Sequence, residues 1–192
     1  WVGSAQLLLG QVKTEAKSNE ITAIPELLKL LVVEGCLVTL DAMGMQIEIA
    51  AQIVDQGGDY LLAVKGNHKT VLHDLEDLFA GCDEVQFAAV PHDYAHTIEK
   101  GHGRIDIRRC WTLSDPVYLA YLHRHSDWKA LTTVVRITRE RRIGDHSSHE
   151  SAYFISSRVA SASAFLAAVR DHWSIENQLH ESLDVTFAED PV

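Results

Sequence analysis

Residues 36–69 read CLVTLDAMGMQIEIAAQIVDQGGDYLLAVKGNHK, and this stretch decides the expected fold. It contains two short apolar runs, residues 36–40 and 60–64, which are typical of strands covered on both faces. Between the runs, three apolar residues recur every four positions, as in an amphipathic helix: Met45, Ile49 and Ile53. A strand, a helix and a second strand in this order predict a parallel sheet with helices packed on it.

Further elements are predicted on both sides of this unit. Residues 25–33 are expected to form a helix that begins at Pro25, because proline suits the first helical turn. Another helix is expected over residues 69–79, after a turn at residues 65–67. Near the start of the chain, residues 5–13 (AQLLLGQVK) are predicted to form a strand.

The pattern becomes β-rich after Gly81. Strands are predicted for residues 97–112, 131–142 and 152–156, and Gly101-His102-Gly103 marks a tight turn within the first of these runs. We therefore predict three parts, which are the first part of an α/β core (residues 1–81), a β-rich insertion (82–157) and a C-terminal helix that completes the core (158–192).

The composition indicates an ordinary globular protein. With 192 residues, 46% of them hydrophobic, the chain can bury a real core. No apolar run approaches the roughly 20 residues of a membrane-spanning helix, and no segment has the pattern of a signal peptide. Three widely spaced cysteines argue against a disulfide framework and against a zinc knuckle: Cys36, Cys82 and Cys110. We expect a soluble cytoplasmic protein without a membrane partner.

Charge is unevenly distributed along the chain. The formal net charge of -10 argues against a general nucleic-acid binder. Residues 104–142 are nevertheless rich in arginine, whereas residues 171–190 contain six acids and neither lysine nor arginine. Two interpretations stay open. The basic middle could hold a polyanion beside an acidic metal site, or exposed strands could simply carry arginine while exposed helices carry acid.

Asp41 is the first candidate site residue. It follows a buried strand, and in open α/β sheets the ligand crevice lies at the carboxyl ends of the strands. The alternative is that Asp41 caps the helix that follows, although Gly44 intervenes. Lys65 and Asn67 follow the second buried strand and are expected at the same edge of the sheet. A lysine there could meet a phosphate, or it could simply be solvated.

Glu176 is the second candidate. Residues 161–184 contain no Gly or Pro, and a helix there places four apolar residues on one face: Phe165, Val169, Leu179 and Leu183. Glu176 falls in the middle of that face, one turn from His172 and one turn from His180. A buried glutamate needs a positive partner, which could be one of these histidines or a bound metal ion. Two carboxylates from distant parts of the chain suit a hard cation such as Mg²⁺ better than zinc.

Five strings together resemble the DDE-type transposases of bacterial insertion sequences, specifically the H-repeat-associated group. They are KSNEITAIPELL, VTLDAMGMQIEIA, DYLLAVKGNH, GHGRIDIR and VRDHWSIENQLHESLDVTFAED, and the resemblance runs from about residue 7 to residue 190. It implies a mixed sheet with flanking helices, the RNase H-like core, with a β-rich insertion before the last helix. It also implies three acidic residues that hold two Mg²⁺ ions.

Within this resemblance, Asp41 matches the second acid and Glu176 matches the third. The first acid of the family lies in an Asp-Gly-Lys motif on the first core strand. This sequence contains no such motif, so the first strand is expected to be absent. The chain is then a catalytic-core fragment that is inactive by itself, because two of three acids hold metal weakly. Glu181 also departs from the family, which usually has Trp there.

The resemblance further implies roles for other residues and partners. The residues expected to support Glu176 or to touch DNA are His172, Asn177 and His180. The residues expected to hold the DNA backbone are Lys65, Asn67, His102, Arg104 and Arg108. The partners would be DNA at transposon ends and at the target, and a second copy of the chain is possible. No G-x-x-x-x-G-K-[ST] or G-x-G-x-x-G motif occurs, so nothing supports a nucleotide cofactor.

Three functions remain open from the sequence. The leading one is metal-dependent phosphodiester hydrolysis followed by strand transfer during DNA transposition. The second is an inactive transposase remnant that acts only as a DNA- or protein-binding module. The third is a metal-dependent nuclease with no part in transposition, which would share the same acidic site.

Overall fold

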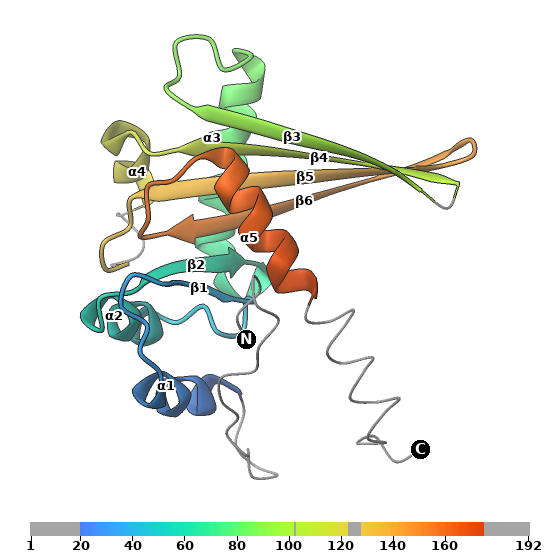
Figure 1. Ribbon diagram of the computed structural model, residues 1–192. Coiled ribbons are helices and arrows are strands. Elements are labelled where there is room, and N and C mark those ends of the chain that lie inside the picture. Colours follow the sequence, from blue (N-terminus) through green and yellow to red (C-terminus); the bar gives the residue numbers. More distant parts are fainter. Residues whose placement is uncertain (1–19, 102, 123–127, 175–192) are drawn as a thin grey trace, which may run out of the picture.

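The computed structural model describes residues 20–101, 103–122 and 128–174. These residues form one six-stranded mixed sheet with helices on both faces (Figure 1). The elements in chain order are α1 (Glu20–Leu30), β1 (Leu37–Leu40), α2 (Ile47–Asp55), β2 (Asp59–Val64), η1 (Gly66–His68), α3 (Lys69–Glu84), β3 (Asp93–Gly101), β4 (Arg104–Leu113), α4 (Pro116–Leu122), β5 (Thr133–Ile143), β6 (His146–Ser156) and α5 (Ala162–Ser174).

The strands lie in the order β1-β2-β6-β5-β4-β3. β1 and β2 are parallel and are connected through α2, which confirms the predicted strand–helix–strand unit. The remaining strands pair antiparallel, and β6 joins them to β2. The strands of the predicted β-rich part therefore continue the same sheet as β1 and β2.

Each face of the sheet carries its own apolar core. On the face that we call the α3 face, helices α2, α3 and α4 pack against residues such as Tyr60, Leu62 and Ile155. On the opposite face, the α5 face, Phe165 and Val169 of α5 pack against residues of β2, β4, β5 and β6. Phe165 is fully buried, and burying a side chain of this size stabilises the fold by roughly 1.5–3 kcal/mol.

Strands β3 to β6 extend past the helices as a long twisted ribbon (Figure 1). β4 and β5 stay paired from Leu113 with Val134, inside the core, to Arg104 with Ile143, at the far end. The described helices cover only the near part of this ribbon (Figure 1).

A buried arginine ties α3 to the base of the ribbon. The guanidinium of Arg136 on β5 donates to both carboxylate oxygens of Asp83, at 2.6 and 2.9 Å. Its carbon Cζ also lies 4.3 Å from the centre of the Trp111 ring, which favours a cation there. The Arg136 side chain is only 7% exposed, so this contact fixes the last turn of α3 against the sheet.

Two helix predictions need correction. α1 begins at Glu20 rather than at Pro25, which lies inside the helix. Proline removes only one backbone donor, and the turn before it packs Ile24 against the core, which offsets that loss. α3 continues through Gly81 to Glu84, because Cys82 is buried and Asp83 meets the sheet. The short helix α4 was not predicted.

Candidate functional site

Asp41 lies directly after β1, as predicted, and is exposed at the carboxyl end of the strand. Its Oδ1 accepts hydrogen bonds from the backbone N–H groups of Met43 and Gly44, at 3.0 and 3.2 Å. The predicted alternative, a cap on the following helix, is wrong, because α2 begins after Gln46 and has no side-chain cap. The two amides hold the carboxylate in the loop through Oδ1, and neither of them bonds to Oδ2.

The turn after β2 holds the loop that carries Asp41. The Asn67 side chain donates to the carbonyl oxygen of Ala42 at 2.5 Å, and His68 Nε2 lies 2.6 Å from the carbonyl oxygen of Met45. The two loops therefore meet at one edge of the sheet, as the parallel pairing of β1 and β2 requires. The amide of Asn67 is engaged in this contact, whereas Lys65 beside it is exposed.

Alternation along β1 places Asp41 on the α5 face. Val38 and Leu40 pack into the core of the α3 face, whereas Leu37 packs into the core of the α5 face. Successive side chains in a strand point to opposite faces, so Thr39 and the residue two positions later share the side of Leu37. Asp41 is that residue.

Helix α5 reaches β1 beside this position. His172 Nδ1 lies 3.0 Å from the hydroxyl oxygen of Thr39, and both side chains are partly buried. Phe165 and Val169 on the same side of α5 are buried, which confirms the predicted phase of the helix up to His172. Glu176, Asn177 and His180 lie outside the described residues, so the placement of Glu176 stays a prediction.

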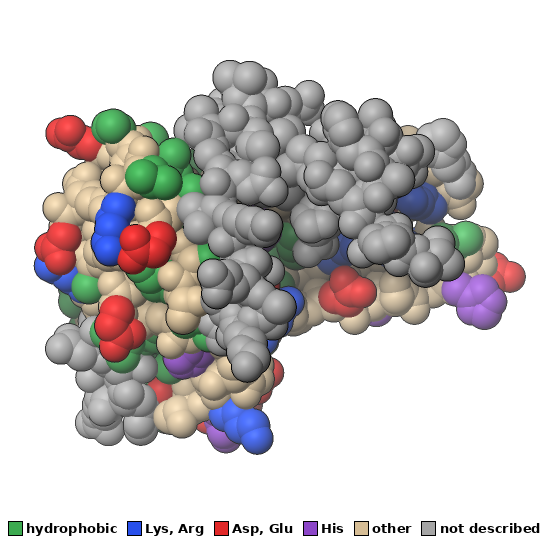
Figure 2. All heavy atoms as spheres, turned by 90° about the horizontal axis from the view of Figure 1, so that it is seen from below, with side chains coloured by type: hydrophobic (Ala, Val, Ile, Leu, Met, Phe, Trp, Pro, Cys, Tyr) green, Lys and Arg blue, Asp and Glu red, His purple; other side chains and the backbone are tan. Residues whose placement is uncertain are grey.

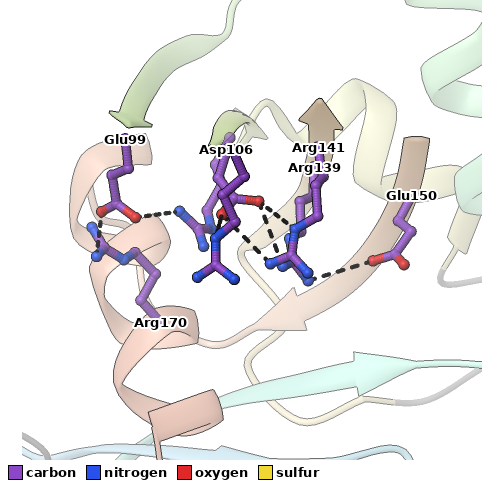
Figure 3. A network of polar contacts seen from close by, with 8 residues as sticks. Glu99, Asp106, Arg139, Arg141, Glu150 and Arg170 are labelled. Carbon is purple, nitrogen blue, oxygen red and sulfur yellow. Dashed lines mark hydrogen bonds and ion pairs between the residues drawn. The ribbon is translucent and has the colours of Figure 1, made fainter. Parts of the chain in front are cut away.

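The predicted DNA-binding arginines belong to a network on the α5 face of the ribbon (Figure 3). Arg104 Nε lies 3.1 Å from Asp106, which is almost fully buried and also contacts Arg141 at 2.8 Å and Arg139 at 3.6 Å. Arg108 is mostly buried, and its Nη1 donates to Glu99 at 2.9 Å. His102, predicted beside them, lies outside the described residues.

The arginines determine the ionisation of Asp106. Burial alone would raise the pKa of this carboxyl, but the hydrogen bond and charge of Arg141, with the charges of Arg104 and Arg108, outweigh burial. The pKa of Asp106 is therefore held below its usual range. A carboxylate in this position stays charged at neutral pH and keeps the surrounding guanidinium groups in place.

Glu99 connects the ribbon to α5. One of its carboxylate oxygens accepts from Arg108 on β4, and the other lies 2.5 Å from Arg170 on α5 (Figure 3). Arg170 precedes His172 by two positions. Helix α5, which precedes the predicted third acid in the sequence, is thus held at two points, one on the ribbon and one on β1.

Several of these residues were missed from the sequence: Thr39, Glu99, Asp106, Arg139 and Arg170. Asp106 carried a usable signal, since a lone acid within RIDIRR is flanked by arginines on the same side of a strand. The other four need the pairing of distant elements before they stand out.

Two searches over the described residues gave negative results. No cluster of three or more His, Cys, Asp or Glu side chains that could hold a metal ion occurs within residues 20–101, 103–122 and 128–174. Among the helices in these ranges, none has the length and hydrophobicity needed to cross a membrane.

Known proteins similar to the chain agree on its family. Residues 2–191 match the family described as "Transposase DDE domain". The chain is 40% identical over 188 residues to the "H repeat-associated putative transposase YhhI" of Escherichia coli (strain K12), covering 96% of this chain and 48% of that protein. It is 42% identical over 187 residues to the "Putative transposase YncI" of Escherichia coli O157:H7, covering 96% of this chain and 47% of that protein.

The chain thus spans about half the length of the curated relatives it matches. No solved structure gives a significant match. The family match covers nearly the whole sequence, and the mixed α/β sheet is consistent with it. The chain belongs to the DDE-domain transposase family.

Proposed function

We propose that this chain supplies the second and third acidic residues of a transposase active site, Asp41 and Glu176. The reaction would be metal-dependent hydrolysis of a phosphodiester at a transposon end, followed by attack of the released 3′-hydroxyl on target DNA. The observation that carries the proposal is the presentation of Asp41. It is exposed at the carboxyl end of β1 and shares the sheet face on which His172 of α5 meets Thr39.

The surroundings of Asp41 fit a hard cation such as Mg²⁺. The ligand is a carboxylate, the type of donor that Mg²⁺ prefers, and Oδ1 is already oriented by two backbone amides. Bound Mg²⁺ would activate a water or hydroxyl group and stabilise the leaving oxygen. Asp41 holds the ion in this proposal, and Glu176 joins it from the residues after α5.

The other residues would position these two acids. Asn67 and His68 hold the loop of Asp41 by its backbone, and His172 holds α5 against β1 through Thr39. Lys65, exposed at the same edge, would contact a DNA phosphate. We also propose that the 192 residues do not cleave DNA by themselves, because they contain no Asp-Gly-Lys motif to provide the family's first acid.

The test uses a longer protein that contains this chain together with an Asp-Gly-Lys strand. Asp41→Asn and Glu176→Gln should each abolish Mg²⁺-dependent nicking of DNA that carries the transposon end, whereas binding of that DNA should persist. Asp145→Asn serves as the control, because Asp145 is an exposed aspartate in the β5–β6 turn. Unchanged nicking by Asp41→Asn would contradict the proposal.

A second candidate function is a DNA-binding module without catalysis. Glu181, which stands where the family usually has Trp, favours it. The two candidates differ in their response to metal. An active site requires Mg²⁺ for nicking by the longer protein, whereas a binding module gives DNA affinity that chelation leaves unchanged and no nicking at any metal concentration.

A further inference from the structure

The α5 face of the ribbon carries more positive than negative charge. The charged residues of the network are Arg104, Arg108, Arg139 and Arg141, with Arg170 of the neighbouring helix α5, against Glu99, Asp106 and Glu150 (Figure 3). Asp93, at the start of β3, adds a fourth acid on the same face. Three of the arginines remain substantially exposed, with side-chain values of 47% for Arg104, 31% for Arg141 and 43% for Arg170. Seen from below, the visible part of the ribbon carries Lys and Arg side chains together with Asp, Glu and His side chains (Figure 2).

The described acids of the protein leave some N–H groups of these arginines without a hydrogen bond. Arg139 lies 3.6 Å from Asp106 and 3.9 Å from Glu150, both longer than a hydrogen bond. The Nε atoms of Arg108 and Arg139 are buried and have no hydrogen-bond partner among the described residues. Arg108 and Arg139 face each other across β4 and β5, so the unsatisfied donors are adjacent.

The opposite face of the same strands offers a contrast. There, Arg109 and Arg142 both donate to Glu140, whose pKa is lowered by these hydrogen bonds, that of Arg142 foremost. Arg136 on that face donates to Asp83 through two nitrogens, although its Nε is also buried without a hydrogen-bond partner among the described residues. The arginines of the α3 face therefore have short contacts to carboxylates, whereas Arg139 on the α5 face has none.

Register places this surface on the same side as Asp41. The strand pairings across β2 and β6 place Leu40 of β1 and Val134 of β5 at the same height in the sheet. β5 also runs in the same direction as β1. Arg139 lies five residues beyond Val134, so it is displaced from Asp41 by three strands sideways and four residues forward. These steps correspond to about 20 Å in a sheet, or about six base pairs of duplex DNA.

We propose that the α5 face of the ribbon binds the sugar-phosphate backbone of duplex DNA beside the reacting phosphodiester. The identity of the partner as DNA rests on the proposed function. Arg104, Arg139, Arg141 and Arg170 contact phosphates, and phosphate oxygens give Arg139 the close acceptors that the protein lacks. Asp106 and Glu99 are internal counter-ions that hold the guanidinium groups in a row.

The experiment compares two matched variants of the 192-residue chain. Arg104→Gln and Arg142→Gln remove side chains of similar exposure, 47% and 52%. Each substitution breaks one ion pair with a nearly buried acid, and that acid keeps another arginine as its partner. They differ in the face from which the charge is removed. Binding to a 25-base-pair fluorescent duplex is measured by anisotropy in EDTA, between 50 and 200 mM salt, with thermal melting to verify folding.

Arg104→Gln and Arg139→Gln should each weaken binding about three- to tenfold and reduce the salt dependence by about one ion per lost phosphate contact. Arg142→Gln should bind like the unmodified chain. Equal losses in Arg104→Gln and Arg142→Gln would show attraction by charge in general and overturn the proposal, as would unchanged binding in Arg104→Gln and Arg139→Gln.

The assay separates this surface from the proposed active site. EDTA removes divalent ions, so binding on the ribbon does not depend on Asp41 or Glu176. If Arg104→Gln weakens binding while Asp41→Asn leaves nicking by the longer protein intact, the surface stands and the proposed function fails. If Asp41→Asn abolishes nicking while the ribbon variants bind normally, the proposed function stands and the surface fails.

Discussion

His172 on α5 and Thr39 on β1 are 133 positions apart in the chain, yet His172 Nδ1 lies 3.0 Å from the Thr39 hydroxyl. Thr39 shares its sheet face with Asp41, two residues further along β1. The contact therefore joins the helix that precedes Glu176 to the strand that ends at Asp41. Both predicted acids lie within four residues of one end of this hydrogen bond.

Replacing Thr39 tests whether this contact positions the site. Thr39→Val keeps the shape and removes the hydroxyl, so the free energy of unfolding should fall by about 1 kcal/mol. If the contact positions α5, nicking by a longer protein with a complete acid set should also fall, with a loss in kcat rather than in DNA affinity. Thr39→Ser restores the hydroxyl and should recover both. Loss of stability with normal kcat would show a purely structural contact.

Asp106 should make the stability of the ribbon depend on pH. Its pKa is lower in the folded than in the unfolded chain, so the carboxylate stabilises the fold above its unfolded pKa of about 3.9. That stabilisation is lost as the pH falls through the lower folded-state value. Urea unfolding should show Asp106→Asn to be clearly destabilised at pH 7, with a smaller difference from the unmodified chain at pH 3. A difference that grows toward pH 3 would contradict the assignment, and Asp145→Asn is the control.

Arg136 should be the arginine whose loss destabilises the fold most among those of β5. Arg136→Met keeps the apolar contact to Trp111 but removes two charge-assisted hydrogen bonds to Asp83. We expect the free energy of unfolding to fall by about 2–3 kcal/mol. Arg142→Gln removes a half-exposed side chain and leaves Glu140 paired with Arg109, so it should change the free energy of unfolding by less than about 1 kcal/mol. Equal effects in chemical denaturation would contradict a special role for Arg136.

Gly44 should be required by the close packing of the loop after Asp41. A Cβ atom at this position would lie 3.0 Å from Leu40 Cβ and 3.1 Å from Ile24 Cδ1. Gly44→Ala should therefore displace the loop, weaken the bond from the Gly44 amide to Asp41, and lower stability by about 1–3 kcal/mol. Gly81→Ala is the control, because a Cβ there meets nothing within 4 Å. Equal melting temperatures for the two variants would contradict this packing.

The sequence predicts the parallel unit well, because its periodicity is local. The runs at residues 36–40 and 60–64 and the spacing of Ile49 and Ile53 each lie within a few turns of chain, and β1, α2 and β2 follow them. The start of α1 was misplaced, since proline is a weak boundary where a preceding turn can bury Ile24. Local propensity could not include that tertiary contact.

Only those parts of the candidate site that depend on a single residue at a recognisable position could be predicted from the sequence. Its position at the end of an apolar strand made Asp41 a candidate without any partner. The contact between Thr39 and His172, and the bridge from Arg108 through Glu99 to Arg170, depend on pairing between distant elements. The sequence could not reveal that Arg139 and Arg141 of β5 also contact Asp106, because that requires the register of β4 against β5.

The most direct test of the central claim is paramagnetic broadening of backbone amide signals by Mn²⁺, which takes the place of Mg²⁺, in the isotope-labelled 192-residue chain. If Asp41 and Glu176 bind one ion, the amides of residues 41–44 and those of residues 175–178 should broaden together at the same Mn²⁺ concentration. Asp41→Asn should remove the effect from both segments. Broadening of one segment alone, or of both segments in Asp41→Asn, would contradict a shared metal site.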